Sequence, residues 1–128
     1  MQPVNIEYHS KSRQLKLTYP NGSVHELTAE YLRVYSPSAE VRGHSPDQYQ
    51  LQSGKKEVKI QAIDPIGNYA IRLSFSDGHD TGIYSWDYLF ELATNHERNW
   101  TEYLRQLKEA NCSRLSTIPI GTWTPEDK

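Results

Sequence analysis

The side chains whose types could do chemistry lie in two distant stretches of the sequence. Asp77, His79 and Asp80 follow a predicted strand, and Ser36 lies in a long predicted loop. Serine, histidine and aspartate are the residue types of a hydrolase triad, but geometry rather than composition defines a triad. The sequence contains no Gly-x-Ser-x-Gly, glycine-rich phosphate loop or His-Glu-x-x-His motif. We therefore expect no catalytic residue; a hydrolytic or small-molecule-binding enzyme stays an alternative that requires a pocket at His79.

Aromatic residues cluster just after the same turn. Tyr84, Trp86 and Tyr88 alternate across a predicted junction between a strand and a helix, so not all three can face the core. Tyrosine and tryptophan side chains that stay at the surface favour interfaces. We therefore expect a contact surface for a protein partner over residues 36–46 and 77–88. Its candidate residues are Ser36, Ser38, Arg42, Asp77, His79, Tyr84 and Trp86.

Hydrophobic periodicity predicts the elements that position these residues. Every second residue from Tyr69 to Phe75 is apolar, which predicts a strand with one buried face. Asp77-Gly78 follows with the chemistry of a hairpin turn, and Ser85 is a plausible N-cap for the next helix. The same criteria predict strands at residues 4–9, 15–19, 24–27, 58–62 and 81–84, and helices that begin after Thr28 and after Thr94 or Asn95.

Three stretches lack such periodicity. Residues 36–56 are rich in Pro, Gly, Ser and Gln and predict a long loop, and residues 63–68 predict a turn. Residues 111–128 predict a flexible tail in which Trp123 is the one aromatic side chain. We therefore expect one domain over residues 1–110, of α+β class, with a small mainly antiparallel sheet and two to three helices.

Composition narrows the class of protein. The 128 residues carry a net charge of −2, which argues against a broad nucleic-acid or anionic-membrane footprint. Cys112 is the single cysteine, a pattern typical of a reducing compartment. No apolar run approaches the roughly 18 residues of a membrane span, and no secretory leader is recognisable. We expect a cytoplasmic protein that does not bind membranes.

One basic stretch is compatible with nucleic-acid binding. Lys55, Lys56 and Lys59 follow Arg42 and Tyr49, and a basic loop with an aromatic side chain can contact phosphates and stack one base. No motif of a nucleic-acid-binding fold accompanies it. The net charge favours the simpler interpretation, a solvated start to the next strand, so we expect no nucleic-acid partner.

Two stretches resemble a known family. They are YLRVYSPSAEVRGH and VKIQAIDPIGNYAIRLSFSDGHDTGIYSWDYLFEL, and the run DGH-x-x-G-x-Y-x-W-x-x-L in the second is fairly specific. Over about residues 4–92 the chain resembles the γ-butyrobetaine hydroxylase-like N-terminal domain family, DUF971. The resemblance implies a small α+β unit with a mainly antiparallel sheet. Domains of the family occur alone in bacteria, ahead of 2-oxoglutarate oxygenases, and attached to P-loop carriers of iron–sulfur clusters.

The resemblance also implies that this chain lacks a zinc site that many relatives have. In many relatives a Cys-x-Cys-x-x-Cys motif follows the first helix and holds a structural zinc together with the histidine of the DGH turn. The matching positions here are Ser36, Ser38 and Val41, so the resemblance implies a branch without zinc. We expect His79 to form a hydrogen bond with Ser36 or Ser38, and Val41 to be buried. A weak, open metal site of His79, His44 and a carboxylate stays an alternative.

Together these inferences favour a small non-enzymatic accessory or interaction domain without a cofactor. Its partner is expected to be a protein, and the fusions known in the family point to iron–sulfur or other metal metabolism. Metal binding through His79 and His44 is the second hypothesis, and hydrolysis or another activity on a small molecule is the third.

Overall fold

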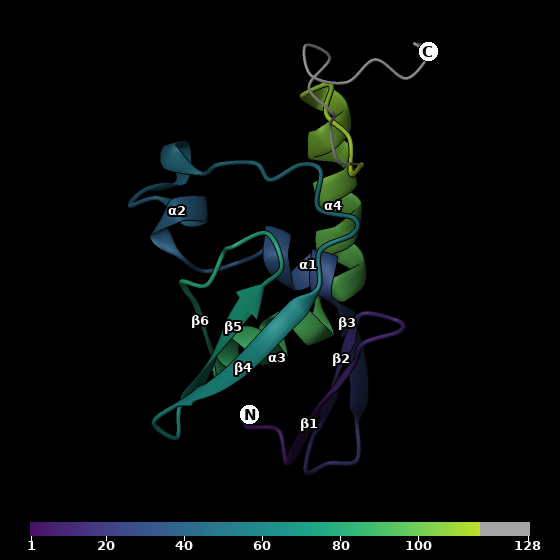
Figure 1. Cartoon of the computed structure of the whole chain (residues 1–128), viewed down its shortest axis with the longest axis vertical. Helices are drawn as coiled ribbons and strands as arrows, with labels where there is room; N and C mark the ends of the chain where they lie inside the picture. Colours follow the sequence, from purple (N-terminus) through teal and green to yellow (C-terminus); the bar gives the residue numbers. More distant parts are fainter. Residues whose placement is uncertain (116–128) are drawn as a thin grey trace.

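The strands form two separate antiparallel sheets. The computed structural model describes residues 1–115, together with the side chains of all of these except Pro46 (Figure 1). The first sheet has the order β1-β2-β3 and the second the order β4-β5-β6, so every pair of neighbours is joined by a hairpin. The strands are β1 (Asn5–His9), β2 (Gln14–Thr18), β3 (Val24–Thr28), β4 (Ile60–Ile66), β5 (Ala70–Phe75) and β6 (Gly82–Ser85). The α+β class is therefore confirmed, with two small sheets in place of one.

The described residues form four α-helices, where the sequence predicts two to three, and three of them begin where it predicts. Thr28 precedes α1 (Ala29–Val34), and its hydroxyl accepts a hydrogen bond from the backbone N–H of Tyr31. Ser85 caps α3 (Trp86–Thr94) in the same way through the N–H of Tyr88. The last helix, α4 (His96–Glu109), has Asn95 at its N-cap position but no side-chain capping bond. Within residues 1–115, no helix is long and apolar enough to cross a membrane.

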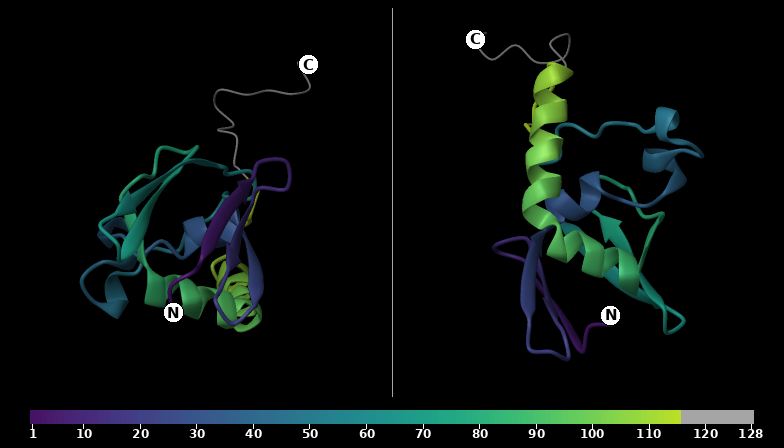
Figure 2. Two further views of the ribbon diagram at one scale, coloured as in Figure 1. Left: turned by 90° about the horizontal axis from the view of Figure 1, so that it is seen from below. Right: turned by 180° about the vertical axis from the view of Figure 1, so that it is seen from behind.

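One hydrophobic core joins the two sheets to α1 and α3. Leu17 of the first sheet, Leu73 of the second, Leu32 of α1 and Leu89 of α3 are all inaccessible to solvent and belong to one cluster. A smaller cluster of Val34, Tyr103 and Leu107 fixes α4 against the end of α1. Figure 2 shows that α4 extends beyond the sheets, and the Tyr103 hydroxyl of α4 donates a hydrogen bond to the Gln52 carbonyl in the long segment before β4.

Two predicted irregular stretches contain regular structure. The loop over residues 36–56 includes the one-turn helix α2 (Ala39–Arg42) and a 3₁₀ turn, η1 (Pro46–Gln48). α2 ends at Gly43, whose φ of 68° suits glycine and whose missing side chain leaves room for Gln48. A single turn is too short to show helical periodicity, which is why the sequence does not predict it.

The strand β4 is longer than its sequence predicts. It continues through Asp64-Pro65 to Ile66, although this dipeptide predicts a turn. β4 lies at the edge of its sheet, where proline can occupy a strand because the missing N–H would face away from the neighbouring strand. The turn is confined to residues between β4 and β5.

Ordered contacts extend past the predicted domain boundary at residue 110. The N–H groups of Gly54 and Lys56 donate to the carbonyl groups of Ser113 and Arg114 at 2.8 and 3.0 Å. The guanidinium of Arg114 donates two hydrogen bonds, of 2.9 and 2.8 Å, to the buried carboxylate of Glu30. These contacts fix the start of the segment predicted as a tail. The rest of that segment, including Trp123, lies outside the described residues.

Candidate functional site

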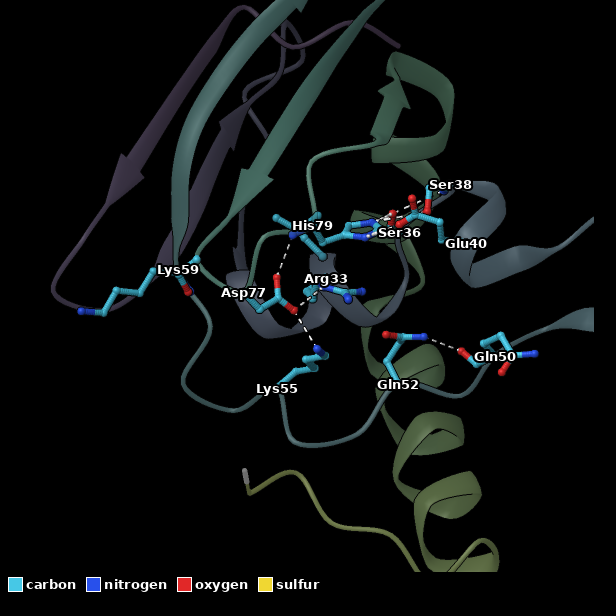
Figure 3. Close-up of polar contacts among 12 residues, drawn as sticks. Arg33, Ser36, Ser38, Glu40, Gln50, Gln52, Lys55, Lys59, Asp77 and His79 are labelled. Atoms are coloured by element: carbon cyan, nitrogen blue, oxygen red, sulfur yellow. Dashed lines mark hydrogen bonds and ion pairs between the residues drawn. The ribbon is translucent and has the colours of Figure 1, made fainter. Parts of the chain in front are cut away.

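The turn after β5 carries His79 into the interior. Its backbone is fixed by two hydrogen bonds, from Phe75 N to His79 O at 2.8 Å and from Gly78 N to Phe75 O at 3.0 Å. The imidazole is only 4% exposed and points at the segment that follows α1 (Figure 3). Two polar clusters meet here: a His79 cluster of Ser36, Ser38, Glu40 and His79, and an ion-pair cluster of Arg33, Lys55 and Asp77.

The His79 ring is hydrogen-bonded at both nitrogens. Nε2 lies 2.8 Å from Oγ of Ser36 and 3.3 Å from Oγ of Ser38, and Nδ1 lies 3.2 Å from Oε1 of Glu40. An ionised carboxylate can only accept a hydrogen bond, so the neutral ring carries its proton on Nδ1. Nε2 then accepts a hydrogen bond from the Ser36 hydroxyl. Burial lowers the pKa of His79, and the nearby charge of Arg33 lowers it further.

Two predictions about this segment, the hydrogen bond of His79 to a serine and the burial of Val41, are confirmed. His79 bonds to both serines, and Val41 is buried in the protein with 1% of its surface exposed. The residue set does not fit structural zinc, because neutral hydroxyls are poor ligands and an isopropyl group cannot ligate. Among the described residues, no group of three or more His, Cys, Asp or Glu side chains could hold a metal ion. Glu40, rather than His44, is the side chain beside the ring.

Gly82 at the start of β6 completes the packing around Ser36. A Cβ atom at this position would lie 2.6 Å from Oγ of Ser36 and 3.1 Å from the ring of Tyr84. Real Cβ atoms do not approach other heavy atoms so closely, so the serine and the glycine fit together. The glycine of the family-like DGH-x-x-G run therefore has a steric role.

The order hydroxyl, imidazole, carboxylate in the His79 cluster is that of a hydrolase triad. Its acid is Glu40, which corrects the sequence expectation of Asp77 or Asp80: the one-turn helix α2 directs Glu40 at the ring, whereas Asp77 accepts the backbone N–H of His79 at 3.2 Å. The hydroxyl of Ser36 belongs to a residue with no exposed surface. A substrate carbonyl cannot reach it in this structure, so the arrangement acts as a tie between segments.

Asp77 anchors the second cluster. Its Oδ2 accepts from Nε of Arg33 at 2.9 Å and from Nζ of Lys55 at 2.7 Å. Burial opposes ionisation of this carboxyl, but the hydrogen bonds from Lys55 and from the His79 backbone, with the charge of Arg33, lower its pKa to about 2. Lys55, one of the three lysines of the predicted basic stretch, is therefore held by a carboxylate.

The candidate contact surface needs a correction. Ser36, Ser38, His79 and Tyr84 are each at most 7% exposed, so they cannot contact a partner directly. The sequence predicts a surface position for these residues because polar and aromatic side chains are common at interfaces. In the structure their hydrogen-bond partners lie in the interior. The Tyr84 hydroxyl, for example, donates a hydrogen bond to the Leu32 carbonyl at 2.5 Å. Asp77, Arg42 and Trp86 keep partial exposure; the indole N–H of Trp86 donates to the Asn68 carbonyl at 2.7 Å.

Arg42 borders an open hollow, as Asp77 does elsewhere in the molecule. Its guanidinium lies over the rings of Tyr35 and Tyr49, with its carbon 5.1 and 5.0 Å from the two ring centroids. Nε donates to the Ser36 carbonyl at 3.1 Å, and Nη2 donates to the Tyr88 hydroxyl at 3.4 Å. The side chain is therefore held in one orientation by contacts from three segments.

A hollow of about 300 Å³ adjoins this side chain. We call it the Arg42 groove; the residues that line it are Tyr35, Arg42, Tyr88, Glu91, Leu92, Arg98 and Asn99. Neither Arg42 nor Arg98 forms an ion pair with a carboxylate of the described residues. Sequence reasoning found Arg42 but missed Arg98 and Tyr35, because the packing of α4 against α1 brings them together.

Comparisons with known proteins place the chain in a family. The family described as gamma-butyrobetaine hydroxylase-like, N-terminal, matches residues 6–90. Two solved NMR solution structures are 45% and 46% identical, with TM-scores of 0.79 and 0.77; they cover 93% and 96% of this chain and 94% and 92% of their own. No curated protein matches the chain.

A third solved structure carries the name of the family. It is a crystal structure of a protein with unknown function from Acidithiobacillus ferrooxidans, described as belonging to the DUF971 family. It is 38% identical, with a TM-score of 0.61, and covers 72% of this chain and 92% of its own. The family resemblance predicted from the DGH turn is thus confirmed, and the chain belongs to the γ-butyrobetaine hydroxylase-like N-terminal family, DUF971.

Proposed function

We propose that this protein is a non-enzymatic interaction domain that contacts a protein partner through the Arg42 groove. The observation that carries the proposal is the state of Arg42: its guanidinium lies over two tyrosine rings, at the edge of a hollow, with no carboxylate partner among the described residues. Arginine and tyrosine are the residue types that dominate the binding energy of protein interfaces. An ordered guanidinium also loses little side-chain entropy when it binds.

The His79 cluster supports this surface from beneath. It ties Ser36 to the β5–β6 turn, and the Ser36 carbonyl in turn accepts from Nε of Arg42. The tie therefore determines where the guanidinium lies. By family resemblance, we propose that the partner belongs to iron–sulfur or other metal metabolism, and that the domain acts in a bacterial cytoplasm, to which its single cysteine is suited.

The experiment compares proteins recovered from a lysate of the source organism by three forms of the full chain. Arg98→Glu reverses a charge in the groove without removing a hydrogen bond or ion pair of the described chain, and Lys108→Glu is a matched control on the same helix outside the groove. We expect a defined set of proteins to be recovered by the wild type and by Lys108→Glu and lost with Arg98→Glu. Identical recoveries with all three forms would refute the groove as the contact surface.

The serine, histidine and glutamate order of the His79 cluster favours hydrolysis as a second candidate. A fluorophosphonate probe, which labels activated serines, distinguishes the two functions. Because Ser36 has no exposed surface, we expect no labelling of the folded protein. Labelling that disappears in both Ser36→Ala and His79→Ala would establish the enzymatic function instead.

The metal site considered from the sequence, with His79 and His44 as ligands, makes a different prediction. Elemental analysis of tag-free protein would then find bound zinc or iron.

A further inference from the structure

We propose that the Arg42 groove binds a carboxylate side chain of an acidic segment in the protein partner. This inference rests on the proposed function and adds the chemistry that the partner must present. It assigns two roles: Arg42 is the fixed donor that orients the carboxylate, and Arg98 is a second cation that lines the same hollow.

The hydrogen-bonding edges of Arg42 define where a ligand can bind. One edge of the guanidinium is used within the protein, because Nε donates to the Ser36 carbonyl and Nη2 to the Tyr88 hydroxyl. Nη1 forms no hydrogen bond with the described residues. The end of the fork formed by the two terminal nitrogens is therefore available, and this planar end matches the geometry of a carboxylate.

Arg98 adds a second charge that no hydrogen bond or ion pair of the described residues engages. It lies near the start of α4, it is exposed, and it makes no hydrogen bond or ion pair with the described chain. Glu102, one turn further along the helix, is engaged instead by Arg105 through two hydrogen bonds. The positive charge of Arg98 thus has no ion-pair partner among the described residues, and Arg98 lines the same hollow as Arg42.

Glu91 restricts the class of ligand. It lines the same hollow and its charge disfavours a polyanion such as a nucleic-acid backbone. An extended peptide avoids this repulsion, since its backbone N–H groups can donate to Glu91 while an acidic side chain reaches Arg42. The tyrosine rings on the walls offer apolar surface for the rest of that segment. A single peptide carboxylate therefore fits the groove better than phosphate-rich ligands.

The test is a titration of the full chain, observed by the Nε–Hε NMR signals of Arg42 and Arg98. The probe is the acetylated and amidated peptide Gly-Ser-Glu-Ser-Gly, which carries one carboxylate, and Gly-Ser-Gln-Ser-Gly is its isosteric neutral control. We expect the acidic peptide to shift both arginine signals and the neutral peptide to shift neither. Arg98→Glu is expected to weaken binding by about tenfold or more, and Lys108→Glu to leave it within about twofold.

Several results would overturn the proposal. They are an absence of shifts up to about 10 mM acidic peptide, equal binding of the neutral peptide, and equal weakening by Arg98→Glu and Lys108→Glu. Arg42→Lys provides a second variant that keeps the charge but not the planar fork, and its amide spectrum reports whether the fold survives; unchanged binding would also contradict the assigned role. If the lysate experiment finds a groove-dependent partner whose bound segment is neutral, the proposed function stands and this inference fails.

Discussion

The Oγ atom of Ser36 lies 2.8 Å from Nε2 of His79, although 43 positions separate the two residues in the sequence. Both residues are buried, and Ser38 adds a second hydroxyl at 3.3 Å from the same nitrogen. The bond joins the segment after α1 to the turn between β5 and β6. It therefore fixes a loop whose far end carries Arg42, and removing it tests how much of the local structure depends on one imidazole.

His79→Ala should destabilise the protein and loosen this loop. The substitution leaves the buried hydroxyl of Ser36 without its acceptor, for which we expect a cost of about 1–3 kcal/mol in the free energy of unfolding. Urea denaturation measures this cost. His44→Ala is the control, because His44 is exposed in the same loop and its side chain has no hydrogen bond within the described chain. Equal stability of the two variants would show that the tie is dispensable.

Val41→Ser tests whether packing has replaced a ligand position. Val41 is 1% exposed, so a hydroxyl there would be buried in an apolar site at a cost of about 1–3 kcal/mol. Val4→Ser makes the same chemical change at a position that is 63% exposed, and should change stability by less than about 0.5 kcal/mol. Thermal melting of both variants checks the difference. A melting temperature unchanged by Val41→Ser would contradict the replacement.

Gly82→Ala should be destabilising through its contact with Ser36. The added methyl group would lie 2.6 Å from Oγ of a serine that cannot move without breaking its bond to His79. We expect a loss of about 1–3 kcal/mol, typical of overpacking. Adding Ser36→Ala to Gly82→Ala removes the clashing oxygen, so the double variant should be more stable than the sum of the single effects predicts. Strict additivity in denaturation experiments would show that the two positions do not compete for space.

Local signals in the sequence predicted the elements that depend on neighbouring residues. Thr28 and Ser85 are N-caps in the structure because capping needs only a hydroxyl and the N–H groups of the following turn. The contact of His79 with Ser36 came from the family resemblance, since no local pattern relates residues so far apart. The strand predicted at residues 58–62 ends too early, before Pro65, because the sequence does not show that β4 lies at the edge of its sheet, where proline is tolerated.

The residues that were missed depend on packing between distant segments. Glu40 reaches His79 only because a single turn of helix forms after Ser38, and one turn leaves no periodic pattern. Arg98 joins Arg42 because Tyr103 and Leu107 of α4 pack against α1. Tyr84, predicted at a contact surface, is buried instead, because its hydroxyl donates a hydrogen bond to a carbonyl in the interior. Polar side chains with partners in the interior cannot be recognised from their types alone.

The ion pairs of Asp77 should make the protein more sensitive to acid. The pKa of Asp77 falls from 3.8 to about 2 on folding, so the folded state binds this proton less readily than the unfolded chain. Stability from the ionised carboxylate is therefore fully present above the unfolded value and is lost as the pH falls from about 4 through about 2. Urea midpoints measured across this range should fall more steeply for the wild type than for Asp77→Asn.

The control for Asp77 lies in the same turn. Asp80→Asn removes an exposed carboxylate that forms no ion pair or hydrogen bond with the described chain, so its acid profile should follow that of the wild type. Lys55→Gln should reduce the acid sensitivity only in part, because Arg33 still donates to the same carboxylate oxygen. Parallel profiles for the wild type and Asp77→Asn would mean that the pairs with Arg33 and Lys55 give no net stabilisation. In that case the ion-pair cluster would position the β5–β6 turn without contributing to its stability.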